Sequence, residues 1–181
     1  MSPDHDEILF DAIAFAARVH RHQVRKDGQT PYVSHAYRVA MIVRHVFGFD
    51  EPKMLAASVL HDTIEDTTTD FEDLETNFGR TVAGWVAALT KDTRMPEAER
   101  ERAYCEQLLA AGWQVCVCKL ADIYDNLADS AKLTVGHRRR TVERSQVYLA
   151  VWSGRVPAEA KAAYNLVQNR LHAVESQLAN G

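Results

Sequence analysis

The sequence predicts an all-α fold, a single bundle of about eight to nine helices, and three observations support this prediction. Apolar residues recur at helical spacing almost throughout the 181 residues, and no stretch alternates convincingly like a strand. Glycine, proline and helix-capping residues separate these stretches at short intervals. No linker, internal repeat or low-complexity segment divides the chain, so we expect one domain over residues 1–181.

The first three helices follow from apolar spacing and from their capping residues. Apolar residues from Ile8 to Val19 follow the template of an amphipathic helix. A second helix is expected to begin at Ser34, whose hydroxyl is a natural N-cap, and to end at Gly48. Pro52 suits the first position of a third helix, because no N–H donor is needed there.

Two short helices and a charged loop are expected next. The sequence Thr69-Asp70-Phe71-Glu72 has the form of a capping box and should open a helix that stops near Gly79. Another helix then runs to about Thr90 on the same reasoning from apolar spacing. Residues 91–102 are charged and contain Pro96, so they are interpreted as a loop followed by an exposed helix start.

The last part of the chain supplies four further helices. The first ends at Gly112, and the second covers 113–129 with the mostly apolar first half that is typical of a buried central helix. Helices over 137–152 and 157–178 complete the set. The motif-bearing core is expected at about 8–150, followed by C-terminal helices to 178.

The bulk composition limits the class of protein and its partners. The apolar fraction of 46% and the charged fraction of 25% are typical of a soluble globular protein. No secretory signal is visible at the polar N-terminus, and three cysteines suggest reduced thiols, so we expect a cytoplasmic location. The net charge of -4, without a basic stripe, argues against a nucleic-acid polymer as partner. No run approaches the roughly 20 apolar residues that a membrane span needs, so no membrane association is expected. A small anionic ligand and a homo-oligomer both stay open.

The most informative residues are an imidazole and three carboxylates at the end of the third helix. His61 and Asp62 follow the apolar run 54–60, and Glu65 and Asp66 follow about one helical turn later. Residues three and four apart share a helix face, so the four side chains can lie together. Such a cluster suits cation binding and proton transfer.

Two side chains rarely hold a divalent cation alone, so further ligands are needed. His35 is a candidate, and so is Asp122, because a carboxylate inside an apolar helix must be satisfied. The candidate metal ligands are then His35, His61, Asp62 and Asp122. This mixture of nitrogen and oxygen donors is typical of sites for Mn²⁺, Fe²⁺ or Zn²⁺, and it differs from a site that selects its metal through thiolates. From spacing alone, three alternatives stay open: His35 as a surface residue at a helix start, which is the more common case, Asp122 as an ion-pair partner of Lys119, and His61-Asp62 as a C-terminal helix cap.

Three stretches resemble motifs of the RelA/SpoT-type hydrolase domain of the His-Asp (HD) superfamily. They are His22–His35 with its Arg25-Lys26 pair, Ala56–Thr67 around His61-Asp62, and Lys119–Asn126 with the sequence K-L-A-D-I-Y-D-N. Phe78-Gly79 and Leu89-Thr90-Lys91 also stand in family-like places, and the order and spacing match over about residues 8–150. The chain therefore resembles a stand-alone hydrolase similar to the small alarmone hydrolases and the metazoan SpoT homologue.

The resemblance implies an all-α enzyme that uses Mn²⁺ to remove the 3′-pyrophosphate from guanosine tetra- or pentaphosphate. It assigns His35, His61, Asp62 and Asp122 to the metal, and Glu65 and Asp66 to catalysis. It further implies substrate contacts by Arg25, Lys26, Asn126, Arg144 and Tyr148. A chain of this length is expected to carry no synthetase domain. The basic run 137–140 either captures distal phosphates or is a solvated helix start.

The sequence departs from the family pattern near the substrate. Ala36-Tyr37 follows the first motif histidine where the family usually has Pro-Leu, and Ile123 and Ala128 replace residues that are commonly basic. Two alternatives therefore stay open: an HD phosphohydrolase for another nucleotide, such as the 2′-phosphate of NADPH, and an inactive HD domain that binds a nucleotide or a protein. The intact ligand set with both Glu65 and Asp66 argues against the inactive domain.

Overall fold

The computed structural model describes residues 6–179, and this part of the chain is helical without a named strand. The helices are α1 (Glu7–Val19), α2 (Val33–Met41), α3 (Pro52–Leu60), α4 (Thr63–Asp66), α5 (Phe71–Leu89), α6 (Glu97–Ala110), α7 (Trp113–Asp129), α8 (Val135–Val151) and α9 (Lys161–Ala179). A π-helical segment, Ile42–Val46, continues α2, and a 3-10 turn, Ser130–Lys132, follows α7. The all-α prediction is confirmed. None of the described helices is long and apolar enough to cross a bilayer.

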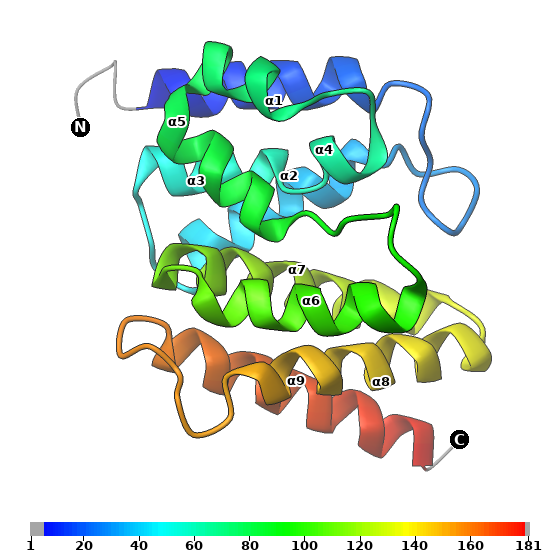
Figure 1. The fold of residues 1–181 in the computed structure, drawn as a ribbon. Helices are drawn as coiled ribbons and strands as arrows, with labels where there is room; N and C mark the ends of the chain where they lie inside the picture. The colour runs from blue at the N-terminus through cyan, green and yellow to red at the C-terminus, as the bar shows by residue number, and fades with distance from the viewer. Residues whose placement is uncertain (1–5, 180–181) are drawn as a thin grey trace.

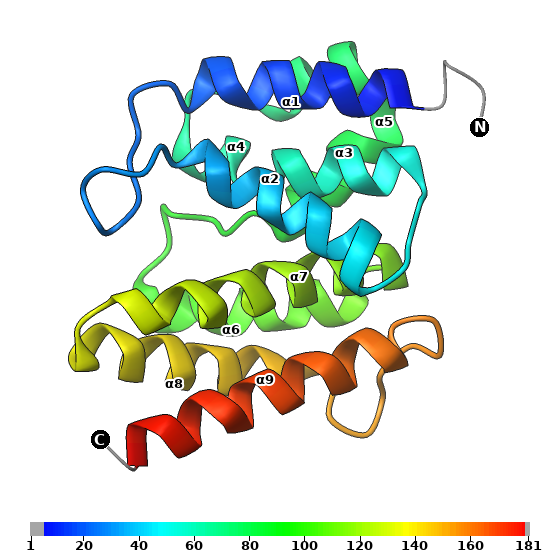
Figure 2. The ribbon, with the colours of Figure 1, turned by 180° about the vertical axis from the view of Figure 1, so that it is seen from behind.

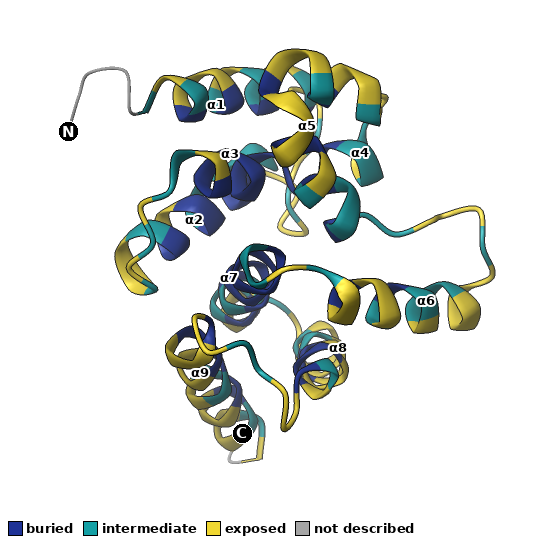
Figure 3. Cartoon of the chain, turned by 60° about the vertical axis from the view of Figure 1, so that its left-hand side comes forward, coloured by how far each residue is buried: buried dark blue, intermediate teal, exposed yellow. Residues whose placement is uncertain are grey.

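The central helix α7 separates two groups of helices. Figures 1 and 2 show α1, α3 and α5 toward one end of the bundle and α8 and α9 at the other, with α7 between them. α7 packs against α2 and α5 on one side and against α8 and α9 on the other. In Figure 3 the buried residues concentrate on α3 and α7, whereas α6, α8 and α9 have largely exposed outer faces. The apolar first half of α7 is the reason for this central place.

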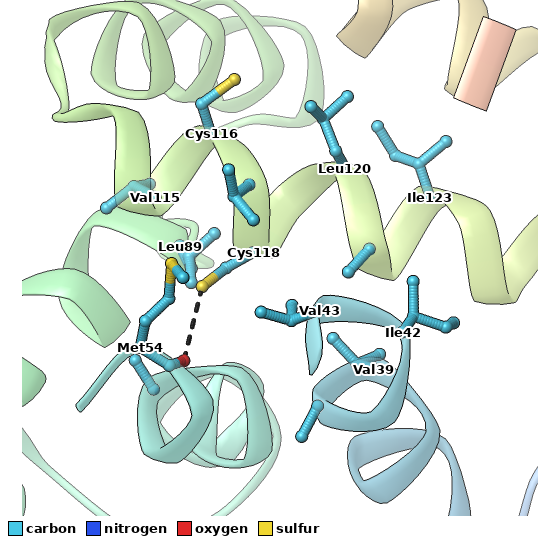
Figure 4. Packing of buried hydrophobic residues seen from close by; sticks show 14 of the residues in the cluster. Val39, Ile42, Val43, Met54, Leu89, Val115, Cys116, Cys118, Leu120 and Ile123 are labelled. Atoms are coloured by element: carbon cyan, nitrogen blue, oxygen red, sulfur yellow. Dashed lines mark hydrogen bonds between the residues drawn. The ribbon is translucent and has the colours of Figure 1, made fainter. Parts of the chain in front are cut away.

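The core forms where α2, α3 and α7 meet. In Figure 4, Val39 and Val43 point toward Met54 and toward the apolar face of α7. Every residue from Met54 to Leu60 is buried, which explains why α3 lacks a polar face. The Cys118 thiol lies 3.8 Å from the Met54 carbonyl oxygen, so this cysteine is a packed core residue, as its apolar neighbours predict.

The start of α2 differs from the expected one. Tyr32 already has helical backbone angles and is the residue before the helix, so the predicted N-cap at Ser34 is wrong. The backbone N–H of Ser34 donates to the Pro31 carbonyl, 3.1 Å away, because the first turn begins before the serine. The helical stretch then passes into the π-helical segment and ends before Gly48, as expected.

Other boundaries shift by one to four residues. The capping box of α5 joins Asp70 and Asp73, one residue later than predicted, because the buried Thr69 is engaged by the Thr67 hydroxyl. The His-Asp pair follows the last residue of α3 and does not lie within it. The helices expected from 137 and 157 begin at Val135 and Lys161, the former with Thr134 as its N-cap.

A kink at Gly79 divides α5 into the two helical parts that the sequence predicts. Its backbone angles, φ 80° and ψ 162°, lie in a region that is essentially restricted to glycine. The second part of α5 carries Leu89 to the edge of the candidate site, so the bend directs the chain toward that site.

Replacing Gly79 by alanine is expected to lower the free energy of unfolding by about 1–3 kcal/mol, because the Cβ atom makes this backbone conformation unfavourable. The matched control is Gly84→Ala in the regular part of the same helix, where the added Cβ meets no atom within 4 Å. The control should be neutral or stabilising by up to about 1 kcal/mol. Chemical denaturation measures both, and equal destabilisation by the two variants would contradict the prediction.

Candidate active site

A cavity of about 490 Å³ lies between the α2–α4 region and helices α7 and α8. All eleven residues that the sequence singled out line it: Arg25, Lys26, His35, His61, Asp62, Glu65, Asp66, Asp122, Asn126, Arg144 and Tyr148. These residues come from positions more than a hundred apart in the chain, so packing of α2, α3, α7 and α8 brings them together. The alternative that His35 is a surface residue is excluded, because only 1% of it is exposed.

The four candidate metal ligands face one another at the inner end of the cavity. His35, His61 and Asp62 each offer one ligand atom, and these atoms lie within 4.8 Å of one another. Asp122 approaches the same histidine nitrogens, because its Oδ1 lies 3.3 Å from His35 Nε2 and 3.9 Å from His61 Nε2. Together they form a cluster of nitrogen and oxygen donors suited to a divalent cation.

The orientation of His61 supports this fit. Its Nδ1 lies 2.9 Å from the Ser58 carbonyl oxygen, which can only accept, so Nδ1 carries a proton. Nε2 is buried without a hydrogen-bond partner among residues 6–179, although Asp62 Oδ2 is only 2.8 Å away. Burial opposes protonation, but the Asp62 and Asp122 carboxylates outweigh it and raise the pKa of His61 to about 9. The cluster therefore favours a positive charge at this point, either a proton or a cation.

The sequence left two interpretations of Asp122 open, a metal ligand and an ion-pair partner of Lys119, and the structure is compatible with both. Its Oδ2 accepts a hydrogen bond from Lys119 Nζ at 2.8 Å, and its Oδ1 faces the histidines. Burial raises the pKa of Asp122, but Lys119 and the histidines outweigh burial and hold it well below the ordinary range. A single carboxylate thus serves both as an ion-pair partner and as a member of the donor cluster.

Glu65 and Asp66 project into the same cavity one turn after the His-Asp pair. Glu65 Oε2 accepts the backbone N–H of Lys91 at 3.0 Å, which fixes the carboxylate against the loop after α5. Partial burial and the nearby Asp62 raise the pKa values of both carboxyl groups. Raised carboxyl pKa values suit groups that exchange protons near neutral pH.

The cations around the cavity fall into two groups. Arg25, Lys91 and Lys119 are paired with carboxylates at 2.8 to 3.0 Å. Lys26, Arg140 and Arg144 have no carboxylate oxygen within 4.0 Å in the described part of the chain. These side chains line the same cavity, and partial desolvation together with the neighbouring Arg144, Arg25 and Arg140 lowers the pKa of Lys26. The unpaired group provides local positive charge for an anionic ligand.

The remaining predicted contacts differ in their freedom to reach a ligand. Arg25 donates to Asp129 at 3.0 Å and to Asn126 Oδ1 at 3.1 Å, so it is held close to α7. Tyr148 is buried and donates its hydroxyl to Glu101 at 2.7 Å, with the Lys119 ammonium 4.6 Å from its ring centroid. Arg144, one turn earlier on α8, is exposed at the cavity rim.

Reasoning from the sequence missed several residues of this site. Tyr32 donates a hydrogen bond to Asp62, and Lys91 and Tyr104 line the cavity from the α5 and α6 side. Asp125 and Arg38 support His35 from behind the cavity. A usable signal existed for Asp125, which stands three residues after Asp122 on the same helix face.

Three kinds of comparison with known proteins point to the same family. A family model described as HD domain matches residues 12–154. The guanosine-3′,5′-bis(diphosphate) 3′-pyrophosphohydrolase MESH1 of Danio rerio is 36% identical over 165 residues, which cover 91% of this chain and 90% of the relative. The MESH1 protein of Homo sapiens is 41% identical over 127 residues, covering 70% of this chain and 71% of the relative. A solved structure of a metazoan ortholog of SpoT that hydrolyzes ppGpp superimposes with a TM-score of 0.79 at 29% identity, covering 94% of this chain and 95% of that one.

Proposed function

The chain belongs to the HD-domain family, and on that premise we propose that it is a guanosine-3′,5′-bis(diphosphate) 3′-pyrophosphohydrolase that depends on Mn²⁺. One observation carries the proposal most directly. A single cavity holds the His/Asp donor cluster, two further carboxylates and three cations without carboxylate partners. A nucleotide with phosphates at two positions needs this combination, since one end reacts and the other must be held. The names of the relatives supply the substrate class.

The proposed ligands are His35, His61, Asp62 and Asp122. When bound there, a divalent cation would lower the pKa of water and neutralise negative charge on phosphoryl oxygens. Lys119 and Tyr32 hold two of these side chains, Asp122 and Asp62, in place through hydrogen bonds. Mn²⁺ suits a set of two imidazoles and two carboxylates.

Glu65 and Asp66 are the groups that we assign to proton transfer. Attack of water on the phosphorus attached to the 3′ oxygen forms a new P–O bond and breaks the bond to that oxygen, so pyrophosphate leaves intact. The attacking water loses a proton, for which Glu65 is the acceptor, and the 3′ oxygen gains one, for which Asp66 is suited by its raised carboxyl pKa. Lys91 keeps Glu65 oriented through its backbone N–H.

A substrate panel tests the proposed function. Purified protein with Mn²⁺ and ppGpp should release GDP and pyrophosphate in equal amounts. Release of orthophosphate only, or turnover of NADPH at its 2′-phosphate without turnover of ppGpp, would assign the site to another nucleotide. Stoichiometric metal binding without turnover of any nucleotide would indicate an inactive HD domain.

The distal phosphates are assigned to the unpaired cations at the cavity rim. Replacing Arg140 by alanine is expected to raise the KM for ppGpp by about tenfold with little change in kcat, because the contact is lost equally from bound substrate and transition state. Arg139→Ala is the matched control, since this neighbouring arginine is exposed and does not line the cavity. Steady-state kinetics of both variants tests the assignment, and equal KM values for the two would contradict it.

A further inference from the structure

His35 lies between two carboxylates of α7, one at each nitrogen of its ring. Its Nε2 lies 3.3 Å from Asp122 Oδ1 in the donor cluster, whereas its Nδ1 lies 2.6 Å from Asp125 Oδ2. Asp122 and Asp125 are three residues apart, so one helix face presents both groups. Asp125 does not line the cavity, and it therefore contacts the ring from the side opposite to the cluster.

Asp125 is held as an ionised acceptor by Arg38. This arginine stands three residues after His35 on α2, and its guanidinium donates to the two Asp125 oxygens at 2.7 and 2.9 Å. This two-pronged contact pairs the carboxylate with a guanidinium, which stays charged at any ordinary pH. A carboxylate paired with arginine can only accept, so Nδ1 of His35 carries a proton, and Nε2 is the nitrogen left to face the cluster and bind a cation there.

The other histidine of the cluster is supported differently. His61 donates its Nδ1 proton to a neutral acceptor, the Ser58 carbonyl, at 2.9 Å. A carboxylate partner makes an imidazole a more basic ligand than a carbonyl partner does, and such partners also fix the tautomer. His35 is the histidine that receives this stronger support.

We propose that Asp125, with Arg38 as its counter-ion, is a positioning residue that holds His35 in the tautomer and orientation needed to bind the divalent cation. This proposal rests on the proposed role of His35 as a metal ligand. Arg38 and Asp125 both lie outside the cavity lining, so they act through His35 and do not touch the substrate. Arg38 also approaches Asp129 at 3.6 Å, and Asp129 in turn binds Arg25.

Replacement of Asp125 by asparagine tests the proposal, because the variant keeps the size of the side chain and removes its charge. Titration calorimetry with Mn²⁺ alone should show affinity reduced by about 10- to 100-fold. In protein loaded with diamagnetic Zn²⁺, ¹⁵N spectroscopy should show the strongly hydrogen-bonded Nδ1–H of His35 in the wild type and its displacement in Asp125→Asn. A general loss of packing would shift the signals of many residues, and not that of His35 in particular.

Three further variants complete the test. Glu159→Gln, which neutralises an exposed carboxylate outside the network of His35, Asp125 and Arg38, should bind Mn²⁺ within about twofold of the wild type. Arg38→Met should weaken Mn²⁺ binding as Asp125→Asn does, and Arg38→Lys should partly rescue it, which keeps the test available if Asp125→Asn does not fold. Wild-type affinity in both Asp125→Asn and Arg38→Met overturns the positioning role and leaves the proposed function intact. Absence of Mn²⁺ binding by the wild type overturns the metal site itself.

Discussion

Replacing His61 by alanine is expected to abolish tight binding of the divalent cation and to lower kcat for ppGpp by at least about 10³-fold. The expectation rests on Nε2, which is buried, lacks a hydrogen-bond partner in the described structure and faces Asp62 and Asp122. Without this nitrogen, two carboxylates remain close together with one histidine fewer to share a cation. Metal content by mass spectrometry and rate measurements on the same sample test the prediction, because both quantities should fall together.

The control for His61→Ala is His172→Ala, which removes an exposed histidine on α9 far along the chain from the cluster. This variant should keep both metal and rate. Circular dichroism must show that His61→Ala retains its helices, since the residue is only 4% exposed and removal of its side chain leaves a cavity. Activity with bound metal at the wild-type level in folded His61→Ala would contradict the assignment of this residue as a ligand.

The sequence was sufficient for the fold class because the helical period and the capping residues are local signals. Trp113 to Asp129 was predicted with the observed bounds, since a glycine precedes it and its apolar half is distinctive. Ser34 was assigned wrongly because a serine hydroxyl is a natural cap only if the preceding residue lies outside the helix. Here Tyr32 is already helical, and its hydroxyl donates to Asp62, a contact that no local pattern contains.

The sequence predicted many of the residues that line the candidate site, but not the contacts among them. Resemblance to known motifs named the eleven residues that line one cavity, but motifs do not show which cations are already neutralised. Arg25 is bound to Asp129, which lies 104 residues later, and Lys91 is bound to Glu101 across the loop before α6. The free positive charge consequently lies with Lys26, Arg140 and Arg144, and the structure selects Arg140 from the basic run 137–140 because it lines the cavity and Arg139 does not.

Replacing Glu65 by glutamine is expected to leave Mn²⁺ affinity nearly unchanged and to lower kcat by about 10² to 10⁴-fold, the usual contribution of a positioned general base. Glutamine keeps the length of the side chain, and its oxygen can still accept the Lys91 N–H. What the variant loses is the ability to take a proton from water. Separation of metal binding from rate distinguishes this residue from His61, for which the two should change together.

The pH dependence of the wild type gives an independent check on Glu65. A general base works in its ionised form, and burial together with the nearby Asp62 raises the pKa of this carboxyl group. Activity should therefore decline, as the pH falls, at a higher pH than an ordinary glutamate would give, and this acid limb should be absent from the residual rate of Glu65→Gln. Glu159→Gln, which changes an exposed glutamate, should retain the wild-type profile. An acid limb of unchanged position in Glu65→Gln would assign the base to another group, with Asp66 as the neighbouring carboxylate to replace next.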